Sequence, residues 1–345
     1  FQTALHSSAN SATITNDGNS DLQPDLLWSK ARGAAYNNAL YSSTLGVRKF
    51  AITNTTASEV TSDSGFDLTS FNTDGFSTGN NQHNIICGGT TYVAWQWHVN
   101  SGTTSSNTEG NVTNTLQVNQ DAGISISKFT SYSSGNTTIG HGLGVAPKAI
   151  IFKRLDAASD WAFYHESLGN VNMCFLNTNP AASSNASILN STSPTSSVFT
   201  VGSDGEVNAN GENYVAYIFA HNNNDGGFGL TNDQDIIKCG SYTGNGSTTG
   251  PVVDLGFEPQ WILVKNSTAS GSNWLMVDNM RGVVTGGDDK YFLPNAASAE
   301  GASNVIDFNA TGFSLKSTGN SVNSSGATYI YMAIRRGDMA VPTDA

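Results

Sequence analysis

The sequence has few charged residues. Asp, Glu, Lys and Arg make up only 12% of its 345 residues, against roughly 25% in typical soluble proteins. Long helices depend on Glu, Lys, Leu and Ala, so this shortage argues against a helical bundle, a coiled coil or a Rossmann-type enzyme. The charges are also unbalanced, since 27 acidic residues outnumber 15 basic ones and the net charge is −12. Such a surface repels phosphate backbones, so we expect no nucleic-acid partner.

Long apolar runs and paired cysteines are also lacking. No stretch approaches about 18 apolar residues, so no membrane insertion is expected. Cys87, Cys174 and Cys239 are odd in number and form no CxxC pair, which predicts buried free thiols and neither a disulfide framework nor a zinc site. The sequence begins with Phe1 and shows no signal peptide, and we expect it to be a segment of a longer protein.

Glycine and aromatic residues are abundant instead. The 36 glycines, together with many Ser, Thr and Asn residues, are typical of short strands joined by turns. The 16 Phe, 11 Tyr and 6 Trp residues are too many for a disordered chain. The composition therefore predicts an all-β protein with well-formed cores.

Two motifs occur three times along the chain. The first is a proline followed six residues later by lysine, and the second is a tyrosine that begins an apolar strand. From proline to tyrosine the separations are 68, 67 and 70 residues. The copies of the first motif are Pro24–Lys30, Pro147–Lys153 and Pro259–Lys265, and those of the second are Tyr92–Trp97, Tyr214–Phe219 and Tyr329–Ile334. This agreement predicts tandem repeats.

Further matches indicate three homologous units. Phe76, Phe199 and Phe313 correspond, as do Asn54–Glu59 and Asn295–Glu300, and Ser131–Asn136 matches Ser241–Asn245, with Ala4–Asn10 as a weaker copy. The predicted organisation is repeat 1 at 1–100, a linker or edge strand at 101–124, repeat 2 at 125–221, a linker at 222–234, repeat 3 at 235–337, and a tail at 338–345 that continues to a further segment.

The pattern within each unit predicts a β-sandwich. The run after each proline is apolar on both faces, as in a strand buried between two layers. In the tyrosine-led strands the strict alternation, for example Val93, Trp95 and Trp97, marks one face as core. The dipeptides before these strands, Gly88-Gly89, Asn210-Gly211 and Ser325-Gly326, predict two-residue hairpin turns. We therefore predict three tandem homologous β-sandwich domains of jelly-roll-like type.

Specific core positions follow from the alignment of the units. Trp28, Phe152 and Val264 are predicted to occupy equivalent buried positions, and so are Trp95, Tyr217 and Met332. In the segment 101–124, Val112, Leu116 and Val118 are expected to pair as an edge strand. Units of about 100 residues are expected to have enough core to fold singly.

At these motifs the sequence resembles a recurrent domain in virion structural proteins of marine tailed bacteriophages, especially those that infect cyanobacteria. The resemblance covers nearly the whole chain and rests on Gln23–Trp28, Ser70–Phe76, Thr91–Trp95, Gly140–Lys148, His165–Gly169, Gly240–Ser247 and Tyr329–Arg336. It implies a tail-fibre-like or other appendage protein of the virion surface, with no established active site. Members of the family usually continue beyond the segment that matches Ala340–Pro342.

Three short motifs contain residue types found in active or metal sites. His165-Glu166-Ser167 holds the types of a catalytic triad, but neighbours in a strand point to opposite faces, so a structural role is favoured. Gly287-Asp288-Asp289 resembles a carboxylate pair and is interpreted as a polar loop. Asp204–Gly211 alternates oxygen side chains as calcium loops do, but lacks the closing glutamate of an EF-hand, so calcium is an alternative only.

Other candidate residues also favour structural interpretations. Gly140, Gly142 and Gly144 lack the helix that a phosphate-binding loop requires. Asn-x-Ser/Thr sequences, which composition alone explains, occur at Asn54, Asn136, Asn245, Asn266 and Asn309. No pair at metal-ligand spacing is found among the histidines, which are His6, His83, His98, His141, His165 and His221. We therefore predict no catalytic residue, no cofactor and no metal site, and the sequence names no ligand-binding residue.

Tryptophans and lysines recur with the repeat. Stacking on sugars is one interpretation of the tryptophans, but burial in the repeated strands is favoured for most of them. The tryptophans are Trp28, Trp95, Trp97, Trp161, Trp261 and Trp274. Lys30, Lys153 and Lys265 share one position, interpreted as a strand end that reaches solvent, with an interface contact as the alternative.

The sequence thus predicts a non-enzymatic bacteriophage virion structural protein, part of a tail fibre or other particle appendage, that attaches to host surfaces through its loops. The expected partners are further copies of the chain, with a homotrimer favoured by analogy with phage fibres, other virion proteins and host surface glycans. One alternative is a secreted carbohydrate-binding, lectin-like module array, which needs exposed aromatic residues in equivalent loops. The second is a glycan-degrading tailspike, which needs two carboxylates in one groove.

Overall fold

A computed structural model describes residues 1–18, 21–132, 136–220 and 235–337. The predicted linker at 222–234, the tail at 338–345 with Ala340–Pro342, and His221 lie outside the described residues. The fold is all-β, as predicted, and its sheets are antiparallel and packed as sandwiches. Its helices are α1 (Ala186–Leu189), α2 (Gly205–Asn208) and the 3-10 helix η1 (Glu166–Leu168). None of the helices in these residues is long and apolar enough to cross a bilayer.

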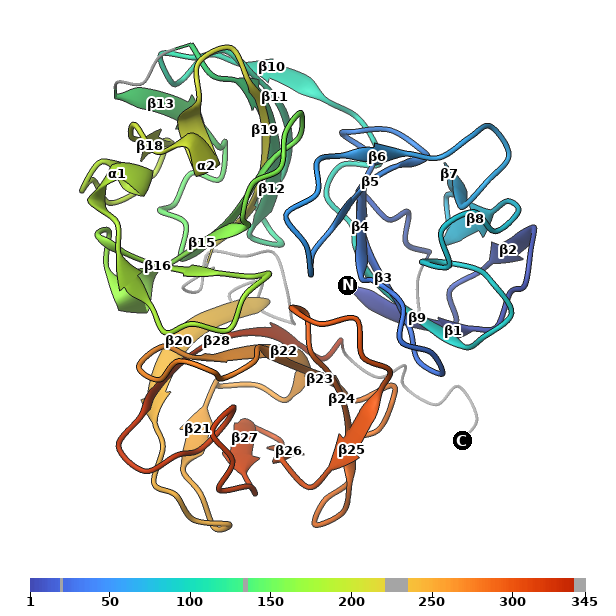
Figure 1. The fold of residues 1–345 in the computed structure, drawn as a ribbon, viewed down its shortest axis with the longest axis vertical. Helices are drawn as coiled ribbons and strands as arrows, with labels where there is room; N and C mark the ends of the chain where they lie inside the picture. Colours follow the sequence, from blue (N-terminus) through green and yellow to red (C-terminus); the bar gives the residue numbers. More distant parts are fainter. Residues whose placement is uncertain (19–20, 133–135, 221–234, 338–345) are drawn as a thin grey trace, which may run out of the picture.

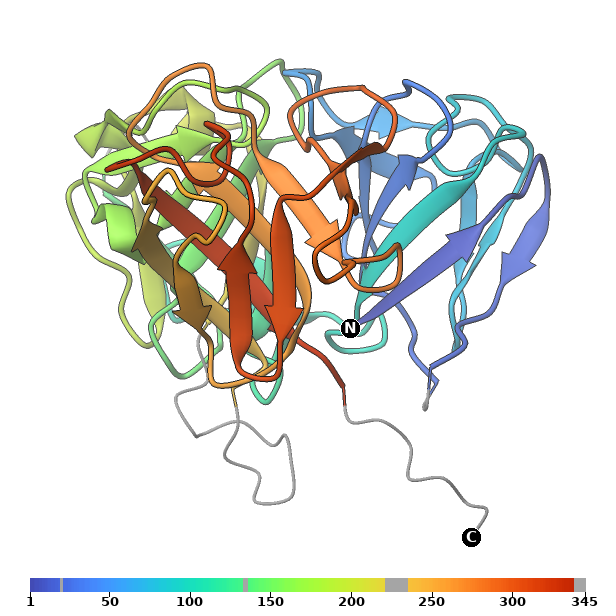
Figure 2. The same ribbon diagram turned by 90° about the horizontal axis from the view of Figure 1, so that it is seen from below.

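The strands form three lobes, which lie side by side around a common centre (Figures 1 and 2). Each lobe has a large sheet on the inner side and a small sheet on the outer side. We call the parts containing β1 to β9, β10 to β19 and β20 to β28 the first, second and third lobe.

The first lobe has the large sheet β1-β9-β3-β4-β5-β6 and the small sheet β2-β8-β7. Its strands are β1 (Gln2–His6), β2 (Ala12–Ile14), β3 (Leu26–Ala31), β4 (Ala39–Ser42), β5 (Lys49–Ile52), β6 (Val60–Thr61), β7 (Leu68–Phe71), β8 (Phe76–Thr78) and β9 (Tyr92–Trp97).

The second lobe has the large sheet β10-β11-β12-β19-β14-β15-β16-β17 and the small sheet β13-β18. Its strands are β10 (Ser105–Asn107), β11 (Asn114–Asn119), β12 (Ile124–Thr130), β13 (Thr137–Gly140), β14 (Ala149–Arg154), β15 (Ala162–His165), β16 (Asn172–Phe175), β17 (Ser183–Ser184), β18 (Val198–Val201) and β19 (Asn213–Phe219). Leu116 and Val118 lie in β11, which pairs with β12 on one side and with β10 on the other, so it is an inner strand and not the expected edge strand. Val112 lies outside β11 and forms a bridge to Ile139 at the small sheet.

The third lobe has the large sheet β20-β28-β22-β23-β24-β25 and the small sheet β21-β27-β26. Its strands are β20 (Ile237–Thr243), β21 (Val252–Asp254), β22 (Pro259–Asn266), β23 (Leu275–Asp278), β24 (Asp289–Phe292), β25 (Gly301–Ser303), β26 (Ile306–Asn309), β27 (Gly312–Leu315) and β28 (Thr328–Arg335). Apart from β10 and β11, the three large sheets therefore have corresponding strand orders.

The register of the two central strands corrects one predicted equivalence. Trp28 lies opposite Trp95, Ile151 opposite Tyr217, and Leu263 opposite Met332. The counterparts of Trp28 are therefore Ile151 and Leu263, and the prediction of Phe152 and Val264 was wrong by one residue. Because the side-chain period of a strand is two, this error reverses the face. All these side chains are nevertheless buried.

Both faces of each large sheet are buried, but against different partners. One face packs on the small sheet of its own lobe, as Phe152 does with Phe199 at a ring-centroid distance of 5.5 Å. The other face packs in one hydrophobic cluster that draws residues from all three lobes, including Trp28, Ile151 and Leu263. We call this cluster the shared core. The alternating residues of the tyrosine-led strands face it, so the predicted core face is confirmed, but the core lies between lobes.

Within each lobe, the tyrosine that begins the repeated strand stacks on one aromatic ring. The pairs are His6 with Tyr92, Phe129 with Tyr214 and Tyr242 with Tyr329, at ring-centroid distances of 5.4, 5.5 and 5.0 Å. Phe129 is thus the counterpart of Tyr242, and the predicted match of Tyr132 to Tyr242 was shifted by three residues.

The turns before the tyrosine-led strands have the positive φ that was predicted. The values are 143° and 77° at Gly88 and Gly89, 81° at Gly211 and 75° at Gly326, a region that glycine enters without steric cost. The prediction of hairpins was wrong, however, because the strands on either side belong to different sheets. Each turn instead carries the chain from the small sheet to the large one.

Candidate functional site

All six tryptophans lie in the shared core. None is more than 4% exposed, which confirms the predicted burial and leaves no indole for stacking on sugars. Trp97 meets Trp261 edge to face across the boundary between the first and third lobes, at a centroid distance of 5.7 Å. Phe163 meets Trp274 in the same way between the second and third lobes, at 4.9 Å. The largest side chains thus hold lobe against lobe.

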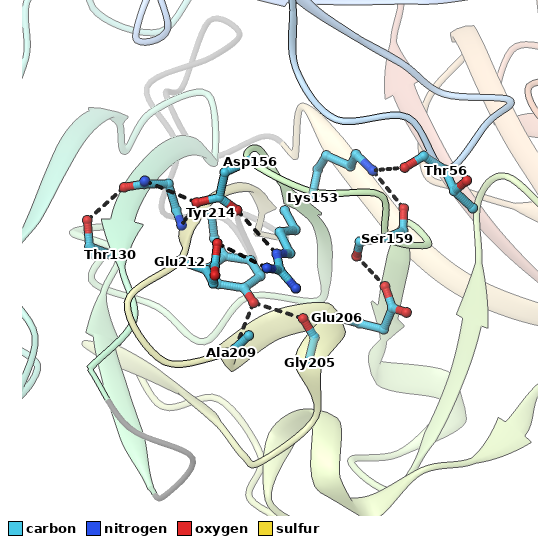
Figure 3. A network of polar contacts seen from close by, with 12 residues as sticks. Thr56, Thr130, Lys153, Asp156, Ser159, Gly205, Glu206, Ala209, Glu212 and Tyr214 are labelled. Atoms are coloured by element: carbon cyan, nitrogen blue, oxygen red, sulfur yellow. Dashed lines mark hydrogen bonds and ion pairs between the residues drawn. The ribbon is translucent and has the colours of Figure 1, made fainter.

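The three repeated lysines are buried at the boundaries between lobes, so the prediction that they reach solvent was wrong and the interface alternative holds. Lys153 Nζ donates to the carbonyl of Ser159 in its own lobe at 2.6 Å and to that of Thr56 in the first lobe at 3.1 Å (Figure 3). Lys265 does the same with Ser272 at 2.7 Å and with Asn179 of the second lobe at 3.2 Å.

Lys30 makes the third contact of this kind, between the first and third lobes. Its Nζ donates to the carbonyl of Tyr36 in its own lobe and, at 2.9 Å, to that of Ala297 in the third lobe. Burial lowers the pKa of each of the three ammonium groups to about 8. Each lysine therefore places a cation between two loops that offer carbonyl oxygens, and each lobe contacts the next in the same direction around the centre.

A backbone hydrogen bond accompanies each lysine. The N–H groups of Glu59, Ala182 and Glu300 donate to the carbonyls of Leu155, Ser267 and Arg32 at 2.8, 2.9 and 3.0 Å. Each acceptor lies two residues after a repeated lysine, and each donor lies in the loop that the lysine contacts. This repetition indicates that the loops at 53–59, 176–182 and 293–300 are the joints of the body.

The boundary between the third and first lobes carries an additional buried ion network. Asp278 accepts a hydrogen bond from Trp95 Nε1 at 2.9 Å and pairs with Arg281 at 2.5 Å. The Arg281 side chain is fully buried and its guanidinium lies 5.2 Å from the Trp95 ring centroid. Glu300 contacts Arg281 at 3.4 Å and binds Arg32 of the first lobe through two hydrogen bonds of 2.8 and 3.0 Å. These four charged residues were not singled out from the sequence.

His165, Glu166 and Ser167 do not form a nucleophile–base pair. The backbone N–H of Ser167, and not its hydroxyl, donates to His165 Nδ1 at 3.2 Å, which leaves Nε2 to donate to the carbonyl of Tyr331 in the third lobe at 3.0 Å. Burial lowers the pKa of His165 to about 4. Glu166 pairs with Lys148 at 2.6 Å. The prediction that these residues are neighbours in a strand was wrong, because Glu166 and Ser167 lie in η1.

The two acidic candidates have structural roles. Asp289 is buried in β24 rather than in a polar loop, and its carboxylate accepts the N–H groups of Val305 and Ile306 at 2.8 and 2.9 Å, although burial raises its pKa. In the run 204–211, Asp204 caps α2 by accepting the N–H of Glu206 at 2.8 Å. Asn208 is buried and donates to the carbonyl of Gly202 at 2.6 Å. The run forms a helix and a turn, a geometry that differs from a calcium loop.

No cluster of three or more His, Cys, Asp and Glu side chains that could hold a metal ion occurs among the described residues. His83 pairs with Asp67 at 2.6 Å, and His141 contacts the carbonyl of Thr195 at 3.1 Å. The three cysteines are free and buried, as predicted. Burial raises the pKa of Cys87 to about 12 and that of Cys174 to about 11, so these thiols are protonated at neutral pH.

The pockets on the described surface include three with volumes of about 190 to 290 Å³. One of about 290 Å³ contains Glu258, but Arg336 pairs with this carboxylate at 2.7 Å. A second, of about 190 Å³, contains Asp17 and lies between the first and third lobes. The third, of about 230 Å³, lies in the third lobe, includes Tyr291 and contains no charged residue. None of the three brings two carboxylates together.

Residues 1–336 match a single family, described as a domain of unknown function (DUF7483). The chain belongs to the DUF7483 family. No curated protein and no solved structure shows a significant match. The DUF7483 match covers residues of all three lobes, which agrees with the shared core.

The structure of this DUF7483 chain completes one match between the repeat units. Asn54 and Asn295 were recognised as equivalent, and the structure adds Asn177 as the third member. The side-chain oxygens of Asn177 and Asn295 accept the N–H groups of Trp161 and Trp274 at 2.9 and 3.1 Å. Recurrence of this asparagine at the start of each joint is the signal that could have located the lobe boundaries.

Proposed function

We propose that the chain is a non-enzymatic structural building block of a bacteriophage virion, part of a tail fibre or other particle appendage. The strongest support comes from the positions of the residues that recur in the three units. The repeated tryptophans, lysines and asparagines lie in contacts between or within lobes, where they build a closed three-lobed body. A body of this kind, with a surface poor in charge, suits a durable particle component, and the resemblance of the repeat motifs to virion proteins points the same way.

The surface also bears on the alternatives. A lectin-like array with equivalent exposed rings in each lobe is disfavoured, because Tyr132, at 70%, is the aromatic side chain that stands out as exposed in the described part of the chain. A glycan-degrading tailspike needs two carboxylates in one groove, and the three pockets described above lack such a pair.

We further propose that the chain associates with copies of itself and with other virion proteins on the particle surface, with a homotrimer as the favoured state. Short, exposed strands at sheet edges support this proposal, because their backbone groups are open to pairing. β10 and β17 are such edges, and most of their residues are exposed. Native mass spectrometry of the purified chain tests the oligomer, and a strictly monomeric chain in solution and in the particle would rule it out.

The particle role has a direct test. Peptides of this chain are expected in the proteome of purified particles of a phage that encodes it, in a constant ratio to a known structural protein. Labelling with antibody fragments and electron microscopy should place the chain on an external appendage. Its absence from gradient-purified infectious particles would refute the proposal.

A further inference from the structure

The third lobe contains a pocket beside the segment that leads to its tyrosine-led strand. The segment leading to the tyrosine-led strand buries Ile85 and Ile86 in the first lobe, and Val207 of α2 in the second. In the third lobe the corresponding segment, 316–327, places Ser317, Gly319, Asn320, Ser321 and Val322 around a pocket of about 230 Å³. Of these, only Val322 belongs to the lobe's apolar core. Val322 lies seven residues before Tyr329, as Val207 lies before Tyr214 and Ile85 before Tyr92, so it is the counterpart of these buried side chains. The pocket is lined by the small polar residues that precede it.

Tyr291 of β24 also lines this pocket. Its counterpart in the first lobe is Phe50, since Phe50 lies opposite Tyr41 and Tyr291 opposite Val277. Phe50 is fully buried, whereas Tyr291 is half-buried. The ring of Tyr291 rests over its cross-strand neighbour Gly301, where a Cβ would come within 2.4 Å of the ring. An aromatic ring packed over a glycine in this way is held in place.

The lining of the pocket defines the chemistry of a ligand. None of its residues is charged, so a charged ligand would lose its hydration without compensation. The amides of Asn273 and Asn320 and the hydroxyls of Ser303, Ser317 and Ser321 belong to groups that both donate and accept hydrogen bonds. Beside them, Tyr291 and Leu275 offer aromatic and aliphatic surface. A sugar ring has this combination of an apolar C–H face and a rim of hydroxyl groups.

The other two pockets fit such a ligand less well. The pocket of about 290 Å³ is lined by Arg335, Arg336 and Glu258, and that of about 190 Å³ includes Asp17. The pocket beside Tyr291 is also smaller than the roughly 300–1,000 Å³ of sites for drug-sized ligands, which favours a single ring over an oligosaccharide. We propose that this pocket binds one neutral pyranose unit of a glycan, with Tyr291 as the stacking residue.

This proposal rests on the proposed function, since it names the class of ligand through which the particle component would attach to a surface. The two can fail separately. Absence of the chain from particles would refute the virion role and leave sugar binding by the purified chain to be measured. Absence of sugar binding would refute the pocket proposal and leave the virion role standing.

The test uses the purified chain and four probes: the methyl glycosides of glucose, galactose, mannose and N-acetylglucosamine. Saturation-transfer difference NMR is expected to show transfer to at least one of them. Tyr291→Ala should weaken the binding at least tenfold, while Tyr291→Phe should keep the stacking surface and most of the affinity. Tyr132→Ala removes a more exposed tyrosine from another lobe and should leave binding unchanged.

A second variant, in which a larger side chain fills the pocket, keeps the test decisive if Tyr291→Ala fails to fold. Ser321→Leu places an aliphatic side chain in the pocket and should abolish transfer while the ring of Tyr291 remains. Its thermal unfolding midpoint should not fall below that of the unmodified chain. Transfer from none of the four glycosides, or transfer that survives both Tyr291→Ala and Ser321→Leu, would overturn the proposal.

Discussion

The boundary between the third and first lobes differs from the two boundaries between lobes that follow one another in the chain. All three share a buried lysine and a backbone hydrogen bond in equivalent positions. Only the boundary between the third and first lobes contains Asp278 and Arg281. The joint at this boundary also pairs Arg32 with Glu300. By strand register and spacing, the counterparts of Asp278 are Ser42 and His165, and those of Arg281 are Leu45 and Leu168.

This difference between the boundaries indicates how the sequence specifies the closed arrangement of the three lobes. A peptide connection keeps consecutive lobes at a high effective concentration, and at their boundaries apolar packing and carbonyl-bound lysines complete the contact. The third and first lobes are separated by the second in the chain. A buried ion network costs desolvation but tolerates only one geometry. We therefore interpret Asp278, Arg281, Glu300 and Arg32 as the group that selects the correct closure of the body.

The largest effect is expected when one lobe is removed. A chain of residues 1–220 would expose the face of the first lobe that bears Trp95 and Trp97, which pack against Phe292 and Trp261 of the third. The expectation that each unit folds singly assumed separate cores, and the shared core leads us to expect the opposite. The fragment should aggregate or bind a hydrophobic dye, and its tryptophan fluorescence should be red-shifted relative to the full chain. A cooperative, dye-free fragment with buried indoles would contradict this.

Breaking the closing network should have the next largest effect. Asp278→Ser inserts the residue that the first lobe has at this position and leaves the Arg281 guanidinium buried beside Glu300 alone. Loss of one partner of a buried ion pair costs about 3–5 kcal/mol, which urea unfolding would measure. The double variant Asp278→Ser/Arg281→Leu copies Ser42 and Leu45 and should regain most of that loss.

The control for this variant is an exposed ion pair of the same kind. Glu166 is half-exposed and pairs with Lys148 at 2.6 Å, so Glu166→Gln should cost less than about 1 kcal/mol. If Asp278→Ser costs no more than Glu166→Gln, the network does not hold the boundary. If the double variant is no more stable than the single one, the shape of the site and not its unpaired charge is responsible.

Much of this fold could be predicted from the sequence. Strand alternation identified the buried faces of the central strands, and the spacing of proline, lysine and tyrosine located those strands. A period of two says that a face is buried but not what covers it, so the shared core could not be predicted. The burial of Lys153 could not be predicted either, because lysine is rarely buried and its acceptors, Thr56 and Ser159, come from loops of different lobes. The pocket beside Tyr291 could not be predicted either. It forms where segment 316–327 meets β23, β24 and β25, and no local sequence motif indicates how these segments pack.

Acid should weaken the boundary between the second and third lobes through His165, the counterpart of Asp278. Burial lowers its pKa from 6.5 to about 4, so the unfolded chain binds the proton more readily. Stability is then fully present above pH 6.5 and is lost as the pH falls toward 4. His6, whose pKa is also lowered to about 4, contributes in the same direction. His165→Gln should remove part of this pH dependence in urea unfolding, while His6 and His141, whose pKa burial also lowers, retain the rest. An unaltered profile in His165→Gln would contradict the assignment.

The smallest expected effect should be the same at all three boundaries. Burial lowers the pKa of Lys30, Lys153 and Lys265 from 10.5 to about 8. Above pH 8 the unfolded chain therefore holds more protons than the folded one, and stability rises with pH, whereas below pH 8 both states are protonated and these lysines add no pH dependence. The unfolded thiols, whose ordinary pKa is 9.0, ionise through the same range and act in the opposite direction, because burial raises the pKa of the folded cysteines. The lysine contribution is therefore the difference between the unmodified chain and each lysine variant, measured from pH 8 to 9, in which the thiol contribution cancels. Replacing any one lysine by methionine should remove about a third of the lysine contribution, and the loss should be the same for all three variants in urea unfolding at both pH values. If the loss were confined to Lys30→Met, the closing boundary would differ from the others in its lysine as well, and the lysines would not be a common element of the three joints.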